Sequence, residues 1–321
     1  MPDVGIRVSR RSTMAATAVG IAASTGVGLV SAHNLLTGQA VQARQVIPKS
    51  WDVPPRADGV YLPAGGPVQR WQRGDDVDVH LMVFGDSTAT GYGCRDAEEV
   101  PGVRLARGLA QRSGKRIRLS TKAIVGATSK GLSGQVDAMF VAGPPPDAAV
   151  IMIGANDVTA LNGIGPSARR LRDAVARLRA SGAVVVVGTC PDFGVITAIP
   201  QPLRWVTRNR GLRLARTQAR EVREAGGVPV PLADLVSPEF RQAPDRMFSA
   251  DRFHPSADGY QLAANQLLPA LCYALEEWPG ELPWQSRSAD SGSLARRLSM
   301  LARFWPQRIT GVPAPMVLGT D

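Results

Sequence analysis

The sequence predicts a doubly wound, three-layer α/β/α fold built on a parallel five-stranded sheet. Three observations support this fold class: five strongly apolar runs, helix-like segments between them, and polar side chains where several of the runs end. Apolar runs of this kind suit strands that are buried on both faces of a parallel sheet. Their alternation with helices is typical of a doubly wound architecture.

The expected strands are short and evenly apolar. They comprise residues 77–84, 116–125, 148–153, 183–187 and 228–232. The last of these contains Pro229 and Pro231, which lack the backbone N–H that a central strand must donate. We therefore expect residues 228–232 to form an edge strand.

Four segments between and after these runs have helical periodicity. They comprise residues 103–112, 168–180, 210–225 and 256–275. In the second, Leu171, Val175 and Leu178 share one face, and the arginines lie largely off it. This arrangement is typical of a helix that packs one apolar face against a sheet.

Residues 1–43 read as a signal peptide or an N-terminal membrane anchor. Arg7, Arg10 and Arg11 precede a stretch from Ser12 to Ala43 that carries no charged residue. A positive start followed by an apolar stretch is the layout of a signal peptide, and this stretch is also long enough to span a bilayer. We expect export to the cell envelope or secretion, with membrane association if the segment is retained.

The remaining chain divides into a lead-in, one large domain and a tail. Residues 44–76 are rich in proline and glycine and read as a linker or lead-in, and residues 77–278 form the α/β domain. Residues 279–321 form a C-terminal tail with a basic amphipathic helix around Leu294 to Phe304. That helix docks on its own domain or lies on a membrane surface.

The chain is basic, with a formal net charge of +10 over 321 residues. Lysine occurs only four times, so nearly all of the positive charge is arginine. We interpret this as a basic, solvated surface and expect no nucleic-acid partner. The oligomeric state is left open.

The cysteine and histidine spacing excludes the common metal sites. Cys94, Cys190 and Cys272 form no Cys-x-x-Cys motif, and no Cys/His spacing suits zinc. We expect no metal and no cofactor. One disulfide is compatible with three cysteines, but the sequence does not indicate its pairing.

A serine and an Asp-x-x-His motif are the candidates for nucleophilic chemistry. Gly85–Ser87 directly follows the first apolar run, and residues 251–255 read Asp-Arg-Phe-His-Pro. Of the three histidines, His33 lies in the N-terminal apolar stretch and His80 inside a predicted strand, which leaves His254 as the candidate base. A serine, a histidine and a carboxylate are the groups that make a hydroxyl nucleophilic.

Two further polar positions follow the next strands. Gly126 follows the second apolar run, and Asn156 follows the third. In a doubly wound fold, ligands bind beyond the carboxyl ends of the parallel strands. We therefore expect Ser87, Gly126 and Asn156 to meet the loop of Asp251 and His254 at one edge of the sheet.

These residues resemble the four blocks of the SGNH hydrolases, also called GDSL-like lipases and esterases. Gly85–Ser87 resembles the nucleophile block, and Gly126 in Val-Gly-Ala-Thr resembles the glycine block. Residues 154–157, Gly-Ala-Asn-Asp, are similar to the Gly-x-Asn-Asp block, and residues 251–255 to the Asp-x-x-His block. The resemblance covers about residues 77–275 and implies the flavodoxin-like fold of that family.

The resemblance also implies roles for these residues in the hydrolysis of carboxylic esters through an acyl-enzyme. Ser87 would be the nucleophile, His254 the base and Asp251 the group that orients it. The oxyanion hole would consist of the backbone N–H groups of Ser87 and Gly126 and the side chain of Asn156. No metal or cofactor takes part in such a reaction.

The substrate is less well defined than the chemistry. The loop at residues 191–208 contains Phe193 and Trp205, which either line an acyl pocket or pack the loop onto the domain. A small-molecule, lipid or glycan ester is expected. Carbohydrate O-deacetylation and lysophospholipid or thioester cleavage remain open, as does a non-catalytic module that binds cell-envelope glycan or lipid on the same scaffold.

Overall fold

The computed structural model describes residues 34–42, 53–56, 58–276 and 282. The chain divides into two units, Met1–Trp278 and Pro279–Asp321, and every element named below belongs to the first. The amphipathic helix expected near Leu294 and most of the N-terminal apolar stretch lie outside the described residues. Within the described part, no helix is both long and apolar enough to cross a bilayer.

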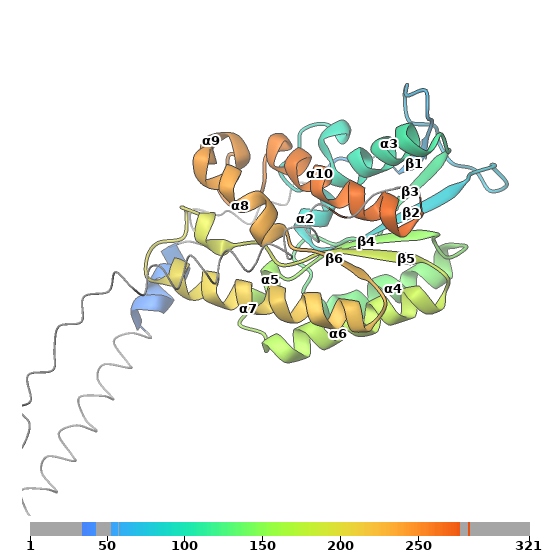
Figure 1. Cartoon of the computed structure of the whole chain (residues 1–321). Coiled ribbons are helices and arrows are strands. Elements are labelled where there is room, and N and C mark those ends of the chain that lie inside the picture. Colours follow the sequence, from blue (N-terminus) through green and yellow to red (C-terminus); the bar gives the residue numbers. More distant parts are fainter. Residues whose placement is uncertain (1–33, 43–52, 57, 277–281, 283–321) are drawn as a thin grey trace, which may run out of the picture. The chain divides into compact units, whose positions relative to one another are not determined.

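The described residues form one six-stranded sheet (Figure 1). Its strands, in spatial order, are β1 (Gly59–Tyr61), β3 (Ile117–Thr121), β2 (Val79–Gly85), β4 (Ala148–Met152), β5 (Val184–Gly188) and β6 (Val228–Val230). The strands from β2 to β6 are parallel, which confirms the five-stranded parallel sheet. The edge strand β6 pairs only with β5, and Pro229 lies within it, as expected.

The antiparallel edge strand β1 was not predicted. It pairs with β3 through Val60 and Arg118, and it lies in the stretch that was expected to be a lead-in. A strand of three residues is too short to show alternation of apolar and polar side chains, so periodicity does not reveal it.

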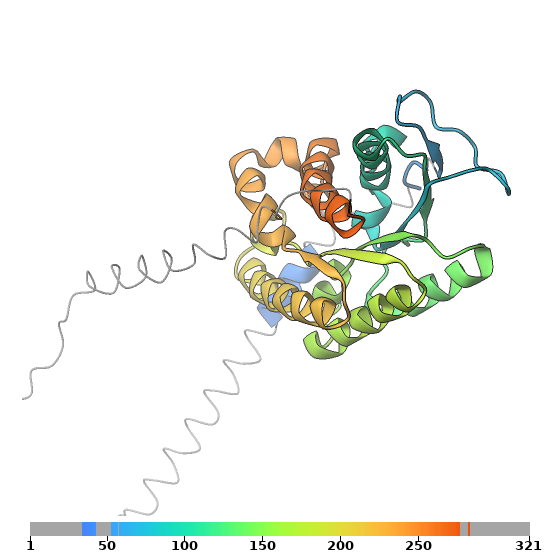
Figure 2. The ribbon, with the colours of Figure 1, turned by 45° about the vertical axis from the view of Figure 1, so that its right-hand side comes forward.

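Helices cover both faces of the sheet (Figures 1 and 2). One face carries α3 (Pro101–Ser113), α8 (Leu232–Gln242), α9 (Pro244–Met247) and α10 (Ala257–Ala274), and the other carries α4 (Leu132–Ala142), α6 (Ile164–Ala180) and α7 (Leu203–Glu224). On the second face, Phe84 and Ile151 pack in one apolar cluster with Leu171 of α6 and Val222 of α7. Strands buried on both faces explain why their sequences are apolar at every position.

The helices differ from the expected ones in two respects. The helix expected at 210–225 begins earlier, at Leu203. Its first turns were not predicted, because polar and charged residues there interrupt the apolar pattern. The helices α4 and α8 were not predicted, since Gly134 and Pro238 interrupt their patterns. The other three expected helices are present as α3, α6 and α10.

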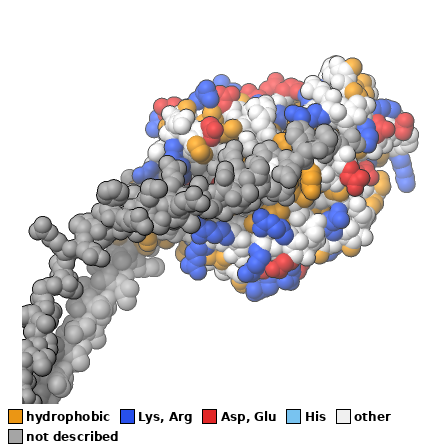
Figure 3. Space-filling model, viewed as in Figure 1, with side chains coloured by type: hydrophobic (Ala, Val, Ile, Leu, Met, Phe, Trp, Pro, Cys, Tyr) orange, Lys and Arg blue, Asp and Glu red, His pale blue; other side chains and the backbone are white. Residues whose placement is uncertain are grey.

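The positive charge of the chain does not form a single continuous area on the face shown in Figure 3. Basic side chains there are interspersed with acidic, hydrophobic and other polar ones. Several arginines in the described residues also pair with carboxylates, as in Arg177 with Asp137 at 2.6 Å.

Candidate active site

Ser87 begins the short helix α2 (Ser87–Thr90) directly after β2. The N-cap of this helix is Asp86, whose side chain accepts a hydrogen bond from the backbone N–H of Thr88 at 3.0 Å. Burial raises the pKa of Asp86 to about 6. Because Asp86 is the N-cap, the hydroxyl of Ser87 is not needed to cap the first turn of the helix.

The turn between β2 and α2 is held from two sides. Gly85 has a φ of +133°, and a Cβ at this position would lie 1.9 Å from the carbonyl oxygen of Met152. The buried side chain of Gln135 accepts from the N–H of Gly85 at 2.9 Å and donates to its carbonyl at 2.8 Å. Gln135 lies 50 residues downstream, so no local sequence signal indicated this contact.

His254 connects Ser87 to Asp251. Its Nε2 lies 3.0 Å from the Ser87 Oγ, and its Nδ1 lies 2.6 Å from the Asp251 Oδ2. All three residues lie at the carboxyl edge of the parallel strands, with Asp251 and His254 in the loop between α9 and α10. The structure therefore brings together the serine, the histidine and the carboxylate that the sequence indicated.

The Asp251 carboxylate is held by four hydrogen bonds in total. Its Oδ1 accepts from the Ser249 hydroxyl at 2.7 Å and from the backbone N–H groups of Phe253 and His254, both at 2.9 Å. Burial by itself would raise the pKa of Asp251, but these bonds and the one from the His254 ring hold it well below its usual range. Asp251 is therefore ionised at neutral pH.

Aromatic rings fix the plane of the His254 imidazole. The ring of Tyr92 lies 4.5 Å from it, centroid to centroid, and the ring of Phe253 packs edge-on at 5.0 Å. The backbone N–H of Ser249 also donates to the His254 carbonyl at 2.8 Å, and Ser256 caps α10. The loop is thus held before and after the histidine.

Gly126 lies on the loop after β3, and Asn156 lies in the short helix α5 (Ala155–Thr159) after β4. Gly126 is exposed, with a φ of +79°, and Asn156 donates through Nδ2 to the Ala127 carbonyl at 3.0 Å. The loop of Gly126 is tied to the end of β2, because the N–H of Ile124 donates to the Gly85 carbonyl at 3.1 Å. Both residues therefore lie at the strand edge that carries Ser87.

The buried carboxylate of Asp157 connects α5 to the segment that follows Gly126. It accepts from the N–H and the hydroxyl of Ser129, both at 2.8 Å, and from Ser167 and Asn162, both at 2.9 Å. Four donors to one carboxylate compensate its burial, so Asp157 is a structural link between α5 and the loop of Gly126.

A cavity of about 90 Å³ lies against Ser87 and His254, and we call it the Ser87 cavity. Phe193 belongs to its wall, whereas Trp205 does not. Trp205 is 61% exposed because α7 begins at Leu203 and directs this side chain outward. Of the two residues expected to line a pocket, the structure brings only Phe193 to the site.

The described residues contain no group of three or more His, Cys, Asp and Glu side chains arranged to hold a metal ion. Cys94, Cys190 and Cys272 are buried, and none of the three forms a disulfide. The structure thus answers the question of disulfide pairing that the sequence left open.

The model of the GDSL-like lipase/acylhydrolase family matches residues 83–262. A GDSL-like esterase of Mycobacterium tuberculosis is 71% identical over 268 residues, which cover 84% of this chain and 85% of that protein.

The solved structures that are similar to this one have lower sequence identity than the mycobacterial esterase. A psychrotrophic esterase of Pseudoalteromonas sp. is 18% identical with a TM-score of 0.49, over 62% of this chain and all (100%) of that one. An acetylxylan esterase of Geobacillus stearothermophilus is 19% identical with a TM-score of 0.47, over 64% of this chain and 96% of that one.

Proposed function

The chain belongs to the GDSL-like lipase/acylhydrolase family, and from this premise we propose that it is a serine esterase that hydrolyses carboxylic esters through an acyl-enzyme on Ser87. The observation that carries the proposal is the pair of contacts made by His254, 3.0 Å to the Ser87 Oγ and 2.6 Å to the Asp251 Oδ2. Both distances are within the reach required for direct proton transfer or orientation.

In the first half of the reaction, His254 acts as the base. As the Ser87 Oγ attacks the ester carbonyl carbon, its proton passes to Nε2, and the ionised Asp251 accepts the Nδ1–H of the resulting imidazolium. The tetrahedral intermediate then collapses, the bond to the alcohol oxygen breaks, and Nε2–H protonates the departing alcohol. Water repeats the sequence on the acyl-enzyme, releases the acid and restores the serine.

The negative oxygen of the intermediate requires donors that are in place before the reaction. We assign this role to the N–H groups of Ser87 and Gly126 and to the Asn156 amide. The Ser87 N–H lies in the first turn of a helix, where backbone donors have no intrahelical acceptor. Asn156 uses one amide hydrogen on Ala127 and retains a second. Removing one such donor costs about 3–4 kcal/mol of barrier in characterised enzymes.

The proposal is tested by active-site labelling combined with ester hydrolysis. The wild type, Ser87→Ala and the matched control Ser133→Ala, an exposed serine on α4, are treated with a fluorophosphonate probe and mapped by peptide mass. We expect the label on Ser87 in the wild type and the control, and hydrolysis of p-nitrophenyl acetate and butanoate only by these two proteins.

Two results would contradict this proposal. Label on another residue would overturn the assignment of Ser87. A wild type as inert as Ser87→Ala over several acyl chain lengths would favour a non-catalytic module that binds glycan or lipid. Acetylated oligosaccharides, lysophospholipids and acyl thioesters, assayed in the same series, separate the finer substrate alternatives.

We also infer that the protein is exported and that its N-terminal segment is retained as an anchor. The helical residues 34–42 support retention, because the side chain of Gln39 donates to the Gln201 carbonyl and accepts from the N–H of Leu203 at 3.0 Å. Cleavage after Ala43 would remove both contacts. Intact mass of the protein from the membrane and the soluble cell-envelope fractions tests this, and a species beginning at Arg44 would contradict retention.

A further inference from the structure

The Ser87 cavity has the position of a site for the acyl part of the substrate. Ser87 and His254 form one end of its wall, and the remainder is contributed by the ends of β4 and β5, the segment after β5, α8 and α10. Gly126 and Asn156 are absent from the wall. In a tetrahedral intermediate the oxyanion and the acyl carbon point in different directions from the carbon bound to Ser87. A pocket for the acyl chain is therefore expected on another side of Ser87 than Gly126 and Asn156.

The wall of the cavity is apolar where it faces away from Ser87. Aromatic and branched aliphatic side chains belong to this part of the wall: Phe193, Phe240, Phe248, Leu232, Val236 and Ile196. Phe193 also meets Phe253 edge-to-face, with ring centroids 6.4 Å apart, and Phe253 in turn packs on the His254 ring. An apolar ligand in this space would therefore lie directly beside the reacting groups.

The polar side chains in this part of the wall already have partners within the protein. Thr189 donates to the Val230 carbonyl at 3.3 Å, and Ser237 donates to the Ala233 carbonyl at 2.5 Å. Since their hydroxyl hydrogens are committed, they offer no donor to a polar substrate group. The cavity thus favours a hydrocarbon chain over a sugar or a charged group.

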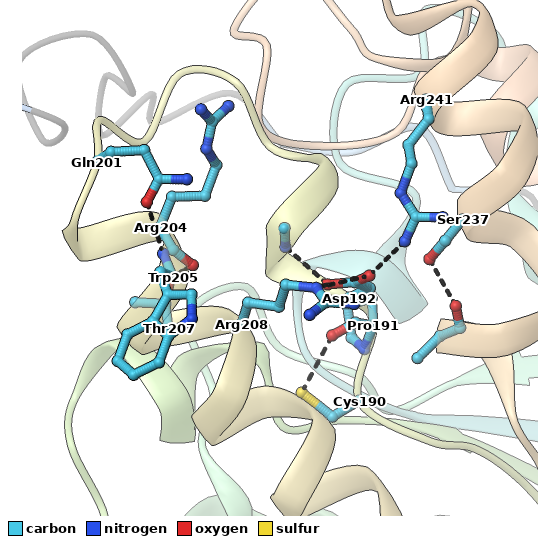
Figure 4. A network of polar contacts seen from close by, with 12 residues as sticks. Cys190, Pro191, Asp192, Gln201, Arg204, Trp205, Thr207, Arg208, Ser237 and Arg241 are labelled. Atoms are coloured by element: carbon cyan, nitrogen blue, oxygen red, sulfur yellow. Dashed lines mark hydrogen bonds and ion pairs between the residues drawn. The ribbon is translucent and has the colours of Figure 1, made fainter. Parts of the chain in front are cut away.

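The carboxylate of Asp192 holds one wall of the cavity in place (Figure 4). It is buried, and it accepts from the Gly194 N–H at 2.7 Å, from Arg241 of α8 at 2.7 Å and from Arg208 of α7 at 3.2 Å. These contacts link the segment that carries Phe193 to two helices. A wall fixed in this way sets an upper limit on the length of the chain that fits.

From these observations we propose that the Ser87 cavity binds the acyl chain of a carboxylic ester and accepts linear chains of about three or four carbons beyond the carbonyl carbon. The length follows from the volume, because a cavity of about 150 Å³ accommodates the six carbons of benzene, whereas this one measures about 90 Å³. The inference rests on the proposed esterase function and adds the class of acyl group.

The test compares kcat/KM for p-nitrophenyl acetate, butanoate and decanoate in wild type, Val236→Phe and Val141→Phe. Val236 belongs to the cavity wall, whereas Val141 is 89% exposed on α4, so the same substitution there is a matched control. Each methylene removed from water contributes about fourfold, the equivalent of about 0.8 kcal/mol. Butanoate has two more methylenes than acetate.

We expect the butanoate-to-acetate ratio to fall about fifteenfold in Val236→Phe and to stay unchanged in Val141→Phe. The wild type should hydrolyse decanoate at least about tenfold less efficiently than butanoate, since the longer chain exceeds the cavity. If Val236→Phe does not yield folded protein, Ala263→Val, a smaller addition to the same wall, is expected to lower the ratio in the same direction.

Failure of this inference is distinguishable from failure of the proposed function. An unchanged ratio in a Val236→Phe protein that still hydrolyses acetate and still carries the fluorophosphonate label on Ser87 would place the acyl chain elsewhere while leaving the esterase intact. Hydrolysis that persists in Ser87→Ala would instead overturn the function itself.

Discussion

Replacement of Asp251 by asparagine is the sharpest test of the role of the carboxylate. Asparagine has nearly the same shape, so its carbonyl oxygen can keep the three bonds that Oδ1 accepts from Ser249, Phe253 and His254. The amide nitrogen then replaces Oδ2, at 2.6 Å from the His254 Nδ1. The loop is preserved, but the group facing the imidazole changes from an acceptor to a donor.

The consequence is a change of tautomer rather than of geometry. With an amide donor opposite Nδ1, that nitrogen must accept, and the ring proton moves to Nε2, which faces Ser87 at 3.0 Å. A protonated Nε2 cannot take the serine proton. The corresponding substitution in a serine protease lowers kcat about 10,000-fold, or about 5.5 kcal/mol, and we expect a loss of that order here.

The assay measures kcat/KM for p-nitrophenyl acetate together with the thermal midpoint of unfolding. Asp173→Asn, which changes an exposed carboxylate on α6, is the control and should retain full activity. Asp251→Asn should remain folded with a lower thermal midpoint than wild type, because three of the four bonds remain but lose the charge that strengthens them. A loss of activity below about tenfold, in a folded protein, would refute the role assigned to Asp251.

Three further predictions concern the scaffold. Gly85→Ala should prevent folding or destabilise the protein by more than about 3 kcal/mol, because its Cβ would overlap the Met152 carbonyl oxygen. The control is Gly134→Ala on α4, where a Cβ would have no atom within 4 Å. This variant should stabilise the protein by about 0.5–1 kcal/mol in urea unfolding. Gln135→Leu should lower the free energy of unfolding by about 1–3 kcal/mol, since the buried N–H of Gly85 loses its partner, whereas its C=O keeps the bond from Ile124. A loss below about 0.5 kcal/mol would argue against the contact. Burial lowers the pKa of His80 to about 4 in the folded protein, whereas a histidine in the unfolded chain has a pKa of about 6.5. Between these two pH values the unfolded chain therefore binds a proton at His80 and the folded chain does not. Stability should therefore fall by about 2 kcal/mol more in wild type than in His80→Gln between pH 7 and pH 5, and parallel pH dependences would contradict this.

The sequence was a good guide to the parallel strands. Runs such as 148–153 are apolar at every position because both faces of the sheet are covered, and that constraint is visible without coordinates. It was a poor guide to β1 and to the start of α7. The three residues of β1 show no period, and the first turns of α7 have no apolar stripe, so in both cases tertiary packing decides the conformation.

The candidate site divides in the same way. Ser87, Asp251 and His254 were apparent because the chemistry requires these side chains in short motifs at the ends of predicted elements. The residues that hold them were not. Gln135 and Tyr92 act through contacts with residues far away in the chain, and their own neighbours in the sequence carry no sign of those contacts.

The amino-acid sequence by itself thus determined the fold class, the order of the parallel strands along the chain, and the serine, histidine and aspartate of the candidate site. Only the tertiary structure decided that Phe193 faces the Ser87 cavity while Trp205 faces solvent, and that Asp192 links the cavity wall to Arg208 and Arg241. The physical reason is the separation in sequence of the residues that interact. Burial and periodicity leave a local pattern in the chain, whereas the shape of a cavity depends on side chains from segments that meet only after folding.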